Sequence, residues 1–308
     1  MKTSFFARAV VLTSCTFLLA ATGCSTGKKS TTELSSATFE TAQQLWNTSE
    51  SVQAPESAFY DSGTGHIYVS NVAGSPFEKD GKGWISKLDA SGNIVEAQWA
   101  TGFHAPKGLR AFQDTLWVSD IDRLVSIDLN SGKITRKVRI KGAKFLNDVA
   151  VGPSGEVYVS DTLTSRIHVV KRGKVSTFLK GSNLESPNGL LVSNGKLIVA
   201  GWGTGVKKDL SSKQPGDLFS VDLKTKKVTK ITQSPLGNLD GLEQLPSGDF
   251  LVSDWVAGKV YTVTASGQVK TLLEGFKGSA DIGFVPSTQT LLVPRMMENQ
   301  VSAYSISK

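Results

Sequence analysis

The sequence predicts an all-β fold, a six-bladed β-propeller with four-stranded blades. A strand-like phrase recurs six times, at intervals of roughly 40 to 50 residues, and a period of this length with strand content is typical of propellers. Each repeat divides into four strand-like runs separated by turn signals, and no segment shows a sustained helical period. The six copies are "IYVSN" at 67–71, "LWVSD" at 116–120, "VYVSD" at 157–161, "LIVAG" at 197–201, "FLVSD" at 250–254 and "LLVPR" at 291–295.

The sixth repeat is one strand short. It contains only the runs "IGFV", "TLLVP" and "VSAYSI" before Lys308. The segment "TFETAQQLW" before the first repeat is the natural source of the missing outer strand, because pairing it with the last blade closes the ring and removes an open sheet edge. We therefore assign residues 38–308 to the propeller.

Residues 1–23 precede this domain and have the pattern of an export signal. Lys2 and Arg8 give a positive start, and residues 9–21 form an apolar stretch too short for a stable membrane span. The stretch ends in "LAATGC", which resembles the lipobox of bacterial lipoproteins and makes Cys24 the expected site of acylation. An ordinary signal peptide with a chance cysteine is the alternative. Residues 24–37 are polar and rich in Ser and Thr, which predicts a flexible tether.

Composition excludes several classes of protein. The formal net charge is +7, and removing Lys2 and Arg8 with the leader lowers it to about +5. The basic residues are dispersed without interleaved aromatic residues, so we expect no nucleic-acid binding. Cys15 and Cys24 are the only cysteines, so the mature domain has no disulfide. We expect a monomer attached by Cys24 to the bacterial cell envelope, at the outer membrane and facing the periplasm.

One position of the repeat is polar in every copy. It opens the run that precedes each strand-like phrase, which should be the innermost strand of its blade and should face the central channel. A buried ring of carboxylates and amides is costly unless something satisfies it, and a hard cation would do so. The six residues at this position are Glu56, Lys107, Asn147, Asn188, Asp240 and Asp281.

Four of these residues supply only oxygen ligands, namely Glu56, Asn147, Asn188 and Asp240. Carboxylate and amide oxygens suit Ca²⁺ and, less well, Mg²⁺ or Mn²⁺. Zn²⁺, which remains an alternative, prefers His and Cys. His66 and His168 fall outside the ring and are interpreted as structural, whereas His104 lies just before the second ring position, near the expected mouth of the channel.

The phrases "PES…YD", "LND", "PNGL" and "LDGL", in this order and phase, resemble the gluconolactonase/regucalcin (senescence marker protein) family of six-bladed propellers. The resemblance covers roughly residues 38–308. It implies that Glu56, Asn147, Asn188 and Asp240 surround a catalytic divalent ion. It also matches Asp148 to the family's aspartate beside the first asparagine.

The chain departs from the family at the expected substrate pocket. Sugar-lactonase members often have an arginine where this chain has Phe145, and Lys107 and Asp281 add charges to the ring. Trp202, Trp255, Met296 and Met297 follow the second strands of their blades, on the same face. We expect Phe145, Lys107, Trp202, Trp255 and Asp281 to bind substrate and to favour an apolar one. Packing between blades is the alternative for the Trp and Met residues.

Other features have simpler interpretations. The long segments 70–83 and 201–216 belong to blades one and four and are either lids or tolerated insertions. Asp120, Asp161 and Asp254 end the "VSD" phrases and are expected to cap loops between blades.

Two functions follow from these observations. The first is a Ca²⁺-dependent hydrolase of lactones or esters, in which Asp240 is the expected general base and Asp148 the second choice. The second is a binding module with a structural ion, whose long loops hold an envelope ligand or a partner protein.

Replacing the acylated cysteine tests the anchor. Cys24→Ser should release the protein from the membrane fraction or leave it unprocessed, because acylation requires the thiol. Fractionation and lipid labelling measure this, with Cys15→Ser inside the leader as the control. Unchanged labelling of Cys24→Ser would contradict the prediction.

Overall fold

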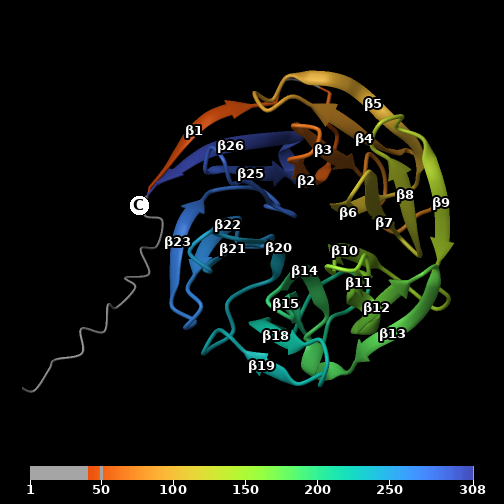
Figure 1. Cartoon of the computed structure of the whole chain (residues 1–308). Helices are drawn as coiled ribbons and strands as arrows, with labels where there is room; N and C mark the ends of the chain where they lie inside the picture. The colour runs from red at the N-terminus through yellow and green to blue at the C-terminus, as the bar shows by residue number, and fades with distance from the viewer. Residues whose placement is uncertain (1–40, 49–50, 308) are drawn as a thin grey trace, which may run out of the picture. The chain divides into compact units, whose positions relative to one another are not determined.

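The computed structural model describes residues 41–48 and 51–307, all of which belong to one compact unit. Six four-stranded antiparallel sheets stand around a common centre, so the prediction of a six-bladed propeller is confirmed (Figure 1). The leader, the tether and Cys24 lie outside the described residues. Within the described ranges, no helix is long and apolar enough to cross a membrane.

The strands of each blade follow one another in sequence from the centre outward. Blade 1 contains β2 (Pro55–Asp61), β3 (His66–Asn71), β4 (Gly83–Leu88) and β5 (Ile94–Phe103), and blade 2 contains β6 (Pro106–Phe112), β7 (Thr115–Asp120), β8 (Arg123–Asp128) and β9 (Ile134–Arg139). Blade 3 contains β10 (Leu146–Val151), β11 (Val157–Asp161), β12 (Arg166–Lys171) and β13 (Lys174–Lys180), and blade 4 contains β14 (Pro187–Ser193), β15 (Lys196–Gly201), β18 (Leu218–Asp222) and β19 (Val228–Lys230). Blade 5 contains β20 (Leu239–Gln244), β21 (Phe250–Asp254), β22 (Lys259–Val263) and β23 (Val269–Glu274), and blade 6 contains β24 (Gly283–Val285), β25 (Thr290–Arg295) and β26 (Gln300–Ser307).

The remaining elements are short. A two-stranded ribbon, β16 (Gly203–Thr204) with β17 (Gln214–Pro215), rises from blade 4 within the long loop between β15 and β18. Three 3₁₀ turns, η1 (Thr162–Thr164), η2 (Ser182–Leu184) and η3 (Met296–Glu298), lie in loops.

The N-terminal strand closes the ring, as predicted. β1 (Thr41–Asn47) pairs antiparallel with β26 and becomes the outermost strand of blade 6, with Thr41 opposite Ser307 and Asn47 opposite Ser302 (Figure 1). The edge that blade 6 would otherwise expose is therefore paired. Since β26 begins next to η3, Thr41 lies at the end of the blade away from the η3 turn.

The hydrophobic core lies between the blades rather than at the centre. Six apolar clusters each join two consecutive blades; one example packs Leu251 and Val260 of blade 5 against Ile282, Leu291 and Val293 of blade 6. Successive side chains of a strand point to opposite faces, so a sheet buried on both sides needs apolar residues at nearly every position. This explains the near-continuous apolar runs in the second strands.

The first strands of neighbouring blades approach closely, and two glycines make this possible. A Cβ added to Gly189 would strike the carbonyl oxygen of Asp240, and one added to Gly241 would lie 2.7 Å from the Cα of Asp281 and closer still to the next backbone nitrogen. The "NG" and "DG" pairs therefore place a small residue directly after a ring residue, where the next blade leaves no room for a side chain.

Gly241→Ala should lower the free energy of unfolding by about 1–3 kcal/mol, the typical cost of overpacking a rigid site. Urea denaturation measures this loss. Gly63→Ala is the control, because its added Cβ would meet only the Asp61 side chain at ordinary contact distance, 3.4 Å. Equal stability of the two variants would show that the inner strands can separate freely.

Candidate functional site

The polar ring residues are positioned by bulges in the innermost strands. In blades 1 to 5 the register between the first and second strand shifts across the ring residue: between Pro55 and Ser57, Pro106 and Leu109, Leu146 and Val149, Pro187 and Leu190, and Leu239 and Leu242. A bulge redirects a side chain and frees backbone groups from the ladder. The same phase of five repeats therefore turns a polar side chain toward the channel.

Serines of the "VSN" and "VSD" phrases satisfy the backbone that the bulges free. Ser70 Oγ accepts the N–H of Ser57 at 2.9 Å, and Ser160 Oγ accepts that of Asp148 at 2.9 Å. The "VSD" aspartates serve the loops: Asp120 Oδ1 accepts the N–H of Ala105 at 2.9 Å, and Asp161 Oδ1 accepts that of Phe145 at 2.9 Å. The expectation that these aspartates cap loops is confirmed at both positions.

All six ring residues are buried, and four of them open onto one cavity of about 310 Å³. The polar residues of its floor are Glu56, Lys107, Asn147 and Asp240. The apolar residues of its wall are Pro76, Phe145, Trp202, Leu210, Trp255, Val256 and Met296. The sequence-predicted substrate residues Phe145, Lys107, Trp202 and Trp255 are thus brought together.

Both long loops contribute to this cavity. Pro76 comes from the loop between β3 and β4, and Asp209, Leu210 and Ser211 come from the loop between β15 and β18. The Nε1 of Trp202 donates to the carbonyl oxygen of Leu210 at 2.8 Å and ties the second loop to the wall. The two insertions therefore help to form the site and are not remote surface loops.

Three buried oxygens of the ring have no donor among the described residues, namely Oε2 of Glu56, Oδ1 of Asn188 and Oδ1 of Asp281. The first two belong to residues that the sequence predicts as ligands of the cation. The Nδ2 of Asn188 donates to the carbonyl oxygen of Leu239 at 3.1 Å, which fixes the amide so that its oxygen remains free. Buried acceptors without donors are rare and costly, and a bound cation would satisfy those of Glu56 and Asn188.

The electrostatics of the floor also favour a cation. Burial raises the pKa of Glu56 well above its ordinary value, and the charge of Asp240 raises it further. Burial raises the pKa of Asp240 in the same way, followed by the charge of Asp281. No cluster of three His, Cys, Asp or Glu side chains suited to a metal is found in the described ranges; the ligands available here are two carboxylates and two amides, the mixture that calcium accepts.

Lys107 adds a positive charge to the floor. Its Nζ donates to the carbonyl oxygens of Ala105 at 3.1 Å and Pro76 at 3.4 Å and lies 4.4 Å from the centroid of the Phe145 ring. Burial lowers the pKa of this ammonium, and the charge of Glu56 opposes that shift.

The wall is aromatic on two sides. The Trp202 and Trp255 rings lie 6.2 Å apart between centroids at a tilt of 51°, and Phe77 packs on Phe145 at 5.0 Å. Met296 lines the cavity, whereas Met297 is exposed and does not. The apolar character expected at this face is confirmed for Met296, Trp202 and Trp255.

Three predicted site residues do not lie on the cavity wall. Asn188 is fully buried in the ring, next to the cavity. Both carboxylate oxygens of Asp148 accept backbone N–H groups at 2.6 Å, from Val149 and Leu190. Asp281 accepts the hydroxyl of Ser57 at 2.5 Å. Asp281 is therefore held within the ring of strands and is not placed to touch a ligand in the cavity.

The histidines are also absent from the cavity wall. The Nδ1 of His104 accepts the N–H of Gly81 at 3.2 Å, so it supports the first long loop. His168 is buried in blade 3, with its Nε2 3.7 Å from an oxygen of Asp161.

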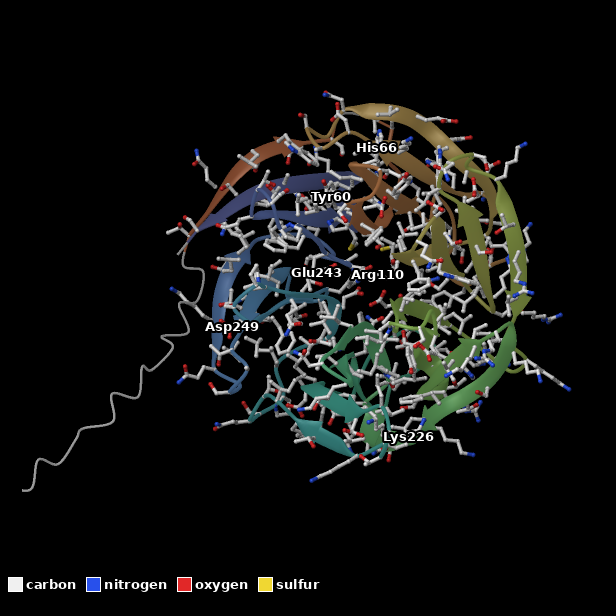
Figure 2. The ribbon with its side chains drawn as sticks, in the orientation of Figure 1. Tyr60, His66, Arg110, Lys226, Glu243 and Asp249 are labelled. Carbon is white, nitrogen blue, oxygen red and sulfur yellow. The ribbon has the colours of Figure 1, made fainter. Side chains whose placement is uncertain are left out.

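Sequence reasoning missed a pair of charges further along the channel. The Arg110 guanidinium donates to Oε1 of Glu243 at 2.8 Å, and Figure 2 shows both residues at the centre of the ring. Although burial opposes it, the charges of Glu243, Asp148 and Asp281 raise the pKa of Arg110. The repeat could have indicated this pair. Arg110 lies three positions after Lys107, and Glu243 lies three positions after Asp240. Their blades, 2 and 5, face each other across a six-bladed ring.

The two partners of this pair should differ in importance. Arg110→Met leaves Asp148, Glu243 and Asp281 without their shared cation and should cost about 3 kcal/mol or more of folding free energy, the usual penalty for leaving a buried charge alone. Glu243→Gln should cost clearly less folding free energy, because the charge of Arg110 still interacts with the charges of Asp148 and Asp281. Urea unfolding near neutral pH compares the variants, and equal losses would contradict the assignment.

Comparisons place this geometry among known folds. No protein-family model and no curated protein sequence matches the chain. Among solved structures, a gluconolactonase from Xanthomonas campestris is similar with a TM-score of 0.67 and 12% identity, covering 86% of this chain and 89% of that one. A calcium-binding regucalcin from Agrobacterium tumefaciens is similar with a TM-score of 0.60 and 18% identity, and the match covers 83% of this chain and 90% of that one.

A virginiamycin B lyase from Staphylococcus aureus, solved with quinupristin, gives a TM-score of 0.59 and 15% identity, and the match covers 86% of this chain and 99% of that one. Identities this low show a common fold and no more. The resemblance predicted from the sequence is thus confirmed at the level of architecture: the chain has the β-propeller fold of solved gluconolactonase and regucalcin structures.

Proposed function

We propose that this protein is a divalent-cation-dependent hydrolase of a lactone or ester. The observation that supports it best is the pair of donorless buried oxygens on Glu56 and Asn188, in the ring that forms the floor of an apolar cavity. A closed structural ion would not need an adjoining cavity of about 310 Å³, whereas a catalytic ion must keep an open position.

Glu56, Asn147, Asn188 and Asp240 would hold the cation. They offer oxygen atoms alone, so Ca²⁺ is the expected ion, with Mg²⁺, Mn²⁺ and Zn²⁺ as alternatives. Bound there, the cation would supply Lewis-acid polarisation of a substrate carbonyl.

Asp240 is the better candidate for the general base. It lies on the cavity floor, so one of its carboxylate oxygens can take a proton from a water molecule in the cavity. Asp148 is buried and does not line the cavity, and its two oxygens already accept N–H groups from Val149 and Leu190. The structure therefore favours Asp240 over Asp148 for proton transfer and favours Asp148 for support of the inner strands.

The apolar wall supports the reaction in a second way. Trp202, Trp255 and Phe145 exclude bulk water from the floor, and interactions of charged groups are stronger in such surroundings. The same wall would also suit a binding module that retains its ligand, which is the rival function.

For location, we propose the cell envelope, with a lipid anchor at Cys24. This rests on the leader and on the "LAATGC" motif.

A substrate panel tests the proposal directly. Phenyl acetate, an alkyl γ-lactone and gluconolactone should be assayed with calcium and with chelator. We expect chelator-sensitive turnover of the first two, with gluconolactone turned over more slowly. Calcium binding without turnover of any compound would favour the binding module.

Calcium should raise the melting temperature, and the increase should grow with pH. The buried carboxyls of Glu56, Asp148, Asp240 and Asp281 have raised pKa values, that of Asp148 being about 7, against about 4 in the unfolded chain. Between these values the metal-free folded state binds more protons than the unfolded state, so its stability falls as pH rises from about 4 to about 7.

Because calcium binds the ionised carboxylates, its stabilising effect should be larger at pH 7.5 than at pH 5.5. Thermal melts of chelator-stripped protein, with and without added calcium, measure this. Asn188→Leu is the control and should remove the effect. Melting curves that calcium leaves unchanged at both values of pH would overturn the metal site.

Asp240→Asn should abolish turnover while weakening calcium binding only partly. The amide retains an oxygen ligand but does not take up the proton. Asp209→Asn is the matched control, because Asp209 lines the cavity from the long loop rather than from the floor. Near-normal turnover by Asp240→Asn would rule out Asp240 as the base.

A further inference from the structure

The Lys107 ammonium is the starting point. It is buried and uses two carbonyl oxygens and one aromatic face, and no carboxylate lies within ion-pair distance of it in the described residues. An ammonium has three N–H donors, so one donor remains for a further partner. Lys107 lines the cavity, and that partner can therefore be a ligand.

The charge of the floor decides which ligand fits. Glu56 and Asp240 carry two negative charges when ionised, and Lys107 carries one positive charge. Without a divalent cation the floor is net negative and repels an anion. With the cation in the ring, the same floor becomes net positive and attracts one.

The cavity wall determines which group the rest of the ligand must carry. The Trp202 indole is fixed by its bond to Leu210 and faces Trp255 across 6.2 Å, and Met296 and Val256 continue the apolar surface. At about 310 Å³, the cavity lies at the small end of ligand sites. The polar end of a bound molecule would meet the floor and an aryl or alkyl group would meet the wall.

We infer that the cation-loaded cavity binds small aryl or alkyl carboxylates, with Lys107 donating to the carboxylate and the Trp202–Trp255 wall holding the apolar group. This inference rests on the proposed function and narrows it, because hydrolysis of an ester or lactone leaves a carboxylate at this position. The substrates are then esters or lactones of apolar acids, and the carboxylate product is retained. The cation and the carboxylate promote each other's binding, since linkage between two sites is reciprocal.

The test is calorimetric titration of the full-length protein with phenylacetate and with its neutral analogue phenylacetamide. In the presence of calcium, phenylacetate should bind about tenfold tighter or more, the difference that one charge-assisted hydrogen bond makes. With chelator that preference should disappear. In the wild type, phenylacetate should also raise the affinity for calcium, by the same factor by which calcium raises the affinity for phenylacetate.

Variants separate the contributions. Lys107→Met should lose the preference for phenylacetate over phenylacetamide while keeping the rise in melting temperature that calcium causes. Trp255→Ala should weaken the binding of phenylacetate but not the binding of acetate. Lys171→Met is the matched control, because Lys171 is exposed and pairs with Glu156 at 2.8 Å on the outer surface; it should behave as the wild type.

The outcomes distinguish the two proposals. If calcium fails to bind, the metal-dependent function is overturned. If calcium binds normally and the wild type does not prefer phenylacetate, or if Lys107→Met retains that preference, the carboxylate site alone is overturned. The wild-type comparison decides the matter even if the Lys107 variant does not fold.

Discussion

The close approach of six inner strands governs the rest of this structure. In five of the six blades the start of the inner strand is bulged at one position of the repeat, and small residues such as Gly189 and Gly241 let neighbouring backbones meet. Polar side chains are thereby forced into a space that water cannot fill freely. The channel holds more carboxylates than cations. The carboxylates are the buried Glu56, Asp148, Asp240 and Asp281 and the half-buried Glu243, and the cations are Lys107 and Arg110. Burial raises the pKa values of Glu56, Asp148, Asp240 and Asp281, and the charges of neighbouring carboxylates raise them further.

The channel resolves the imbalance differently at its two ends. Near one end, Arg110 is shared by Glu243 and two aspartates, so a fixed side chain supplies the positive charge. At the other end, Lys107 lies beside Glu56 and Asp240 without pairing with either, and two oxygens remain without donors. Arg110 and Glu243 line a second cavity together with Phe59 and Phe284, and none of the described residues that line it also lines the cavity of Lys107. The end with Arg110 therefore contains its own ion pair, although Nε of Arg110 and Oδ1 of Asp281 have no partner there. Among the described residues, the end with Lys107 has donorless oxygens and no ion pair, which is the condition for binding a cation from solution.

The sequence was sufficient for the architecture because the repeat itself carries it. Six copies in one phase predict the blades, the polar ring and the closing strand. The sequence was insufficient for the direction of individual side chains. Asp281 shares the phase of Asp240, yet it precedes the shorter β24 and bonds to Ser57 instead of opening onto the cavity. The Arg110–Glu243 pair was missed because the other repeats have apolar residues at that phase, so no ring of polar residues marks it.

The origin of the four proposed ligands has a consequence for stability. Glu56, Asn147, Asn188 and Asp240 come from blades 1, 3, 4 and 5, and the apolar clusters connect each blade mainly to its two neighbours. A cation held by all four would join blade 1 to blades 3, 4 and 5, with which it shares no apolar cluster among the described residues, and would act across the ring, as β1 does at the circumference. Binding energy would then oppose opening of blades 1, 3, 4 and 5, because each such opening would remove a ligand. The innermost strands must approach closely to complete the propeller, and the same strands bring the ligands together. Metal binding and folding would therefore be cooperative.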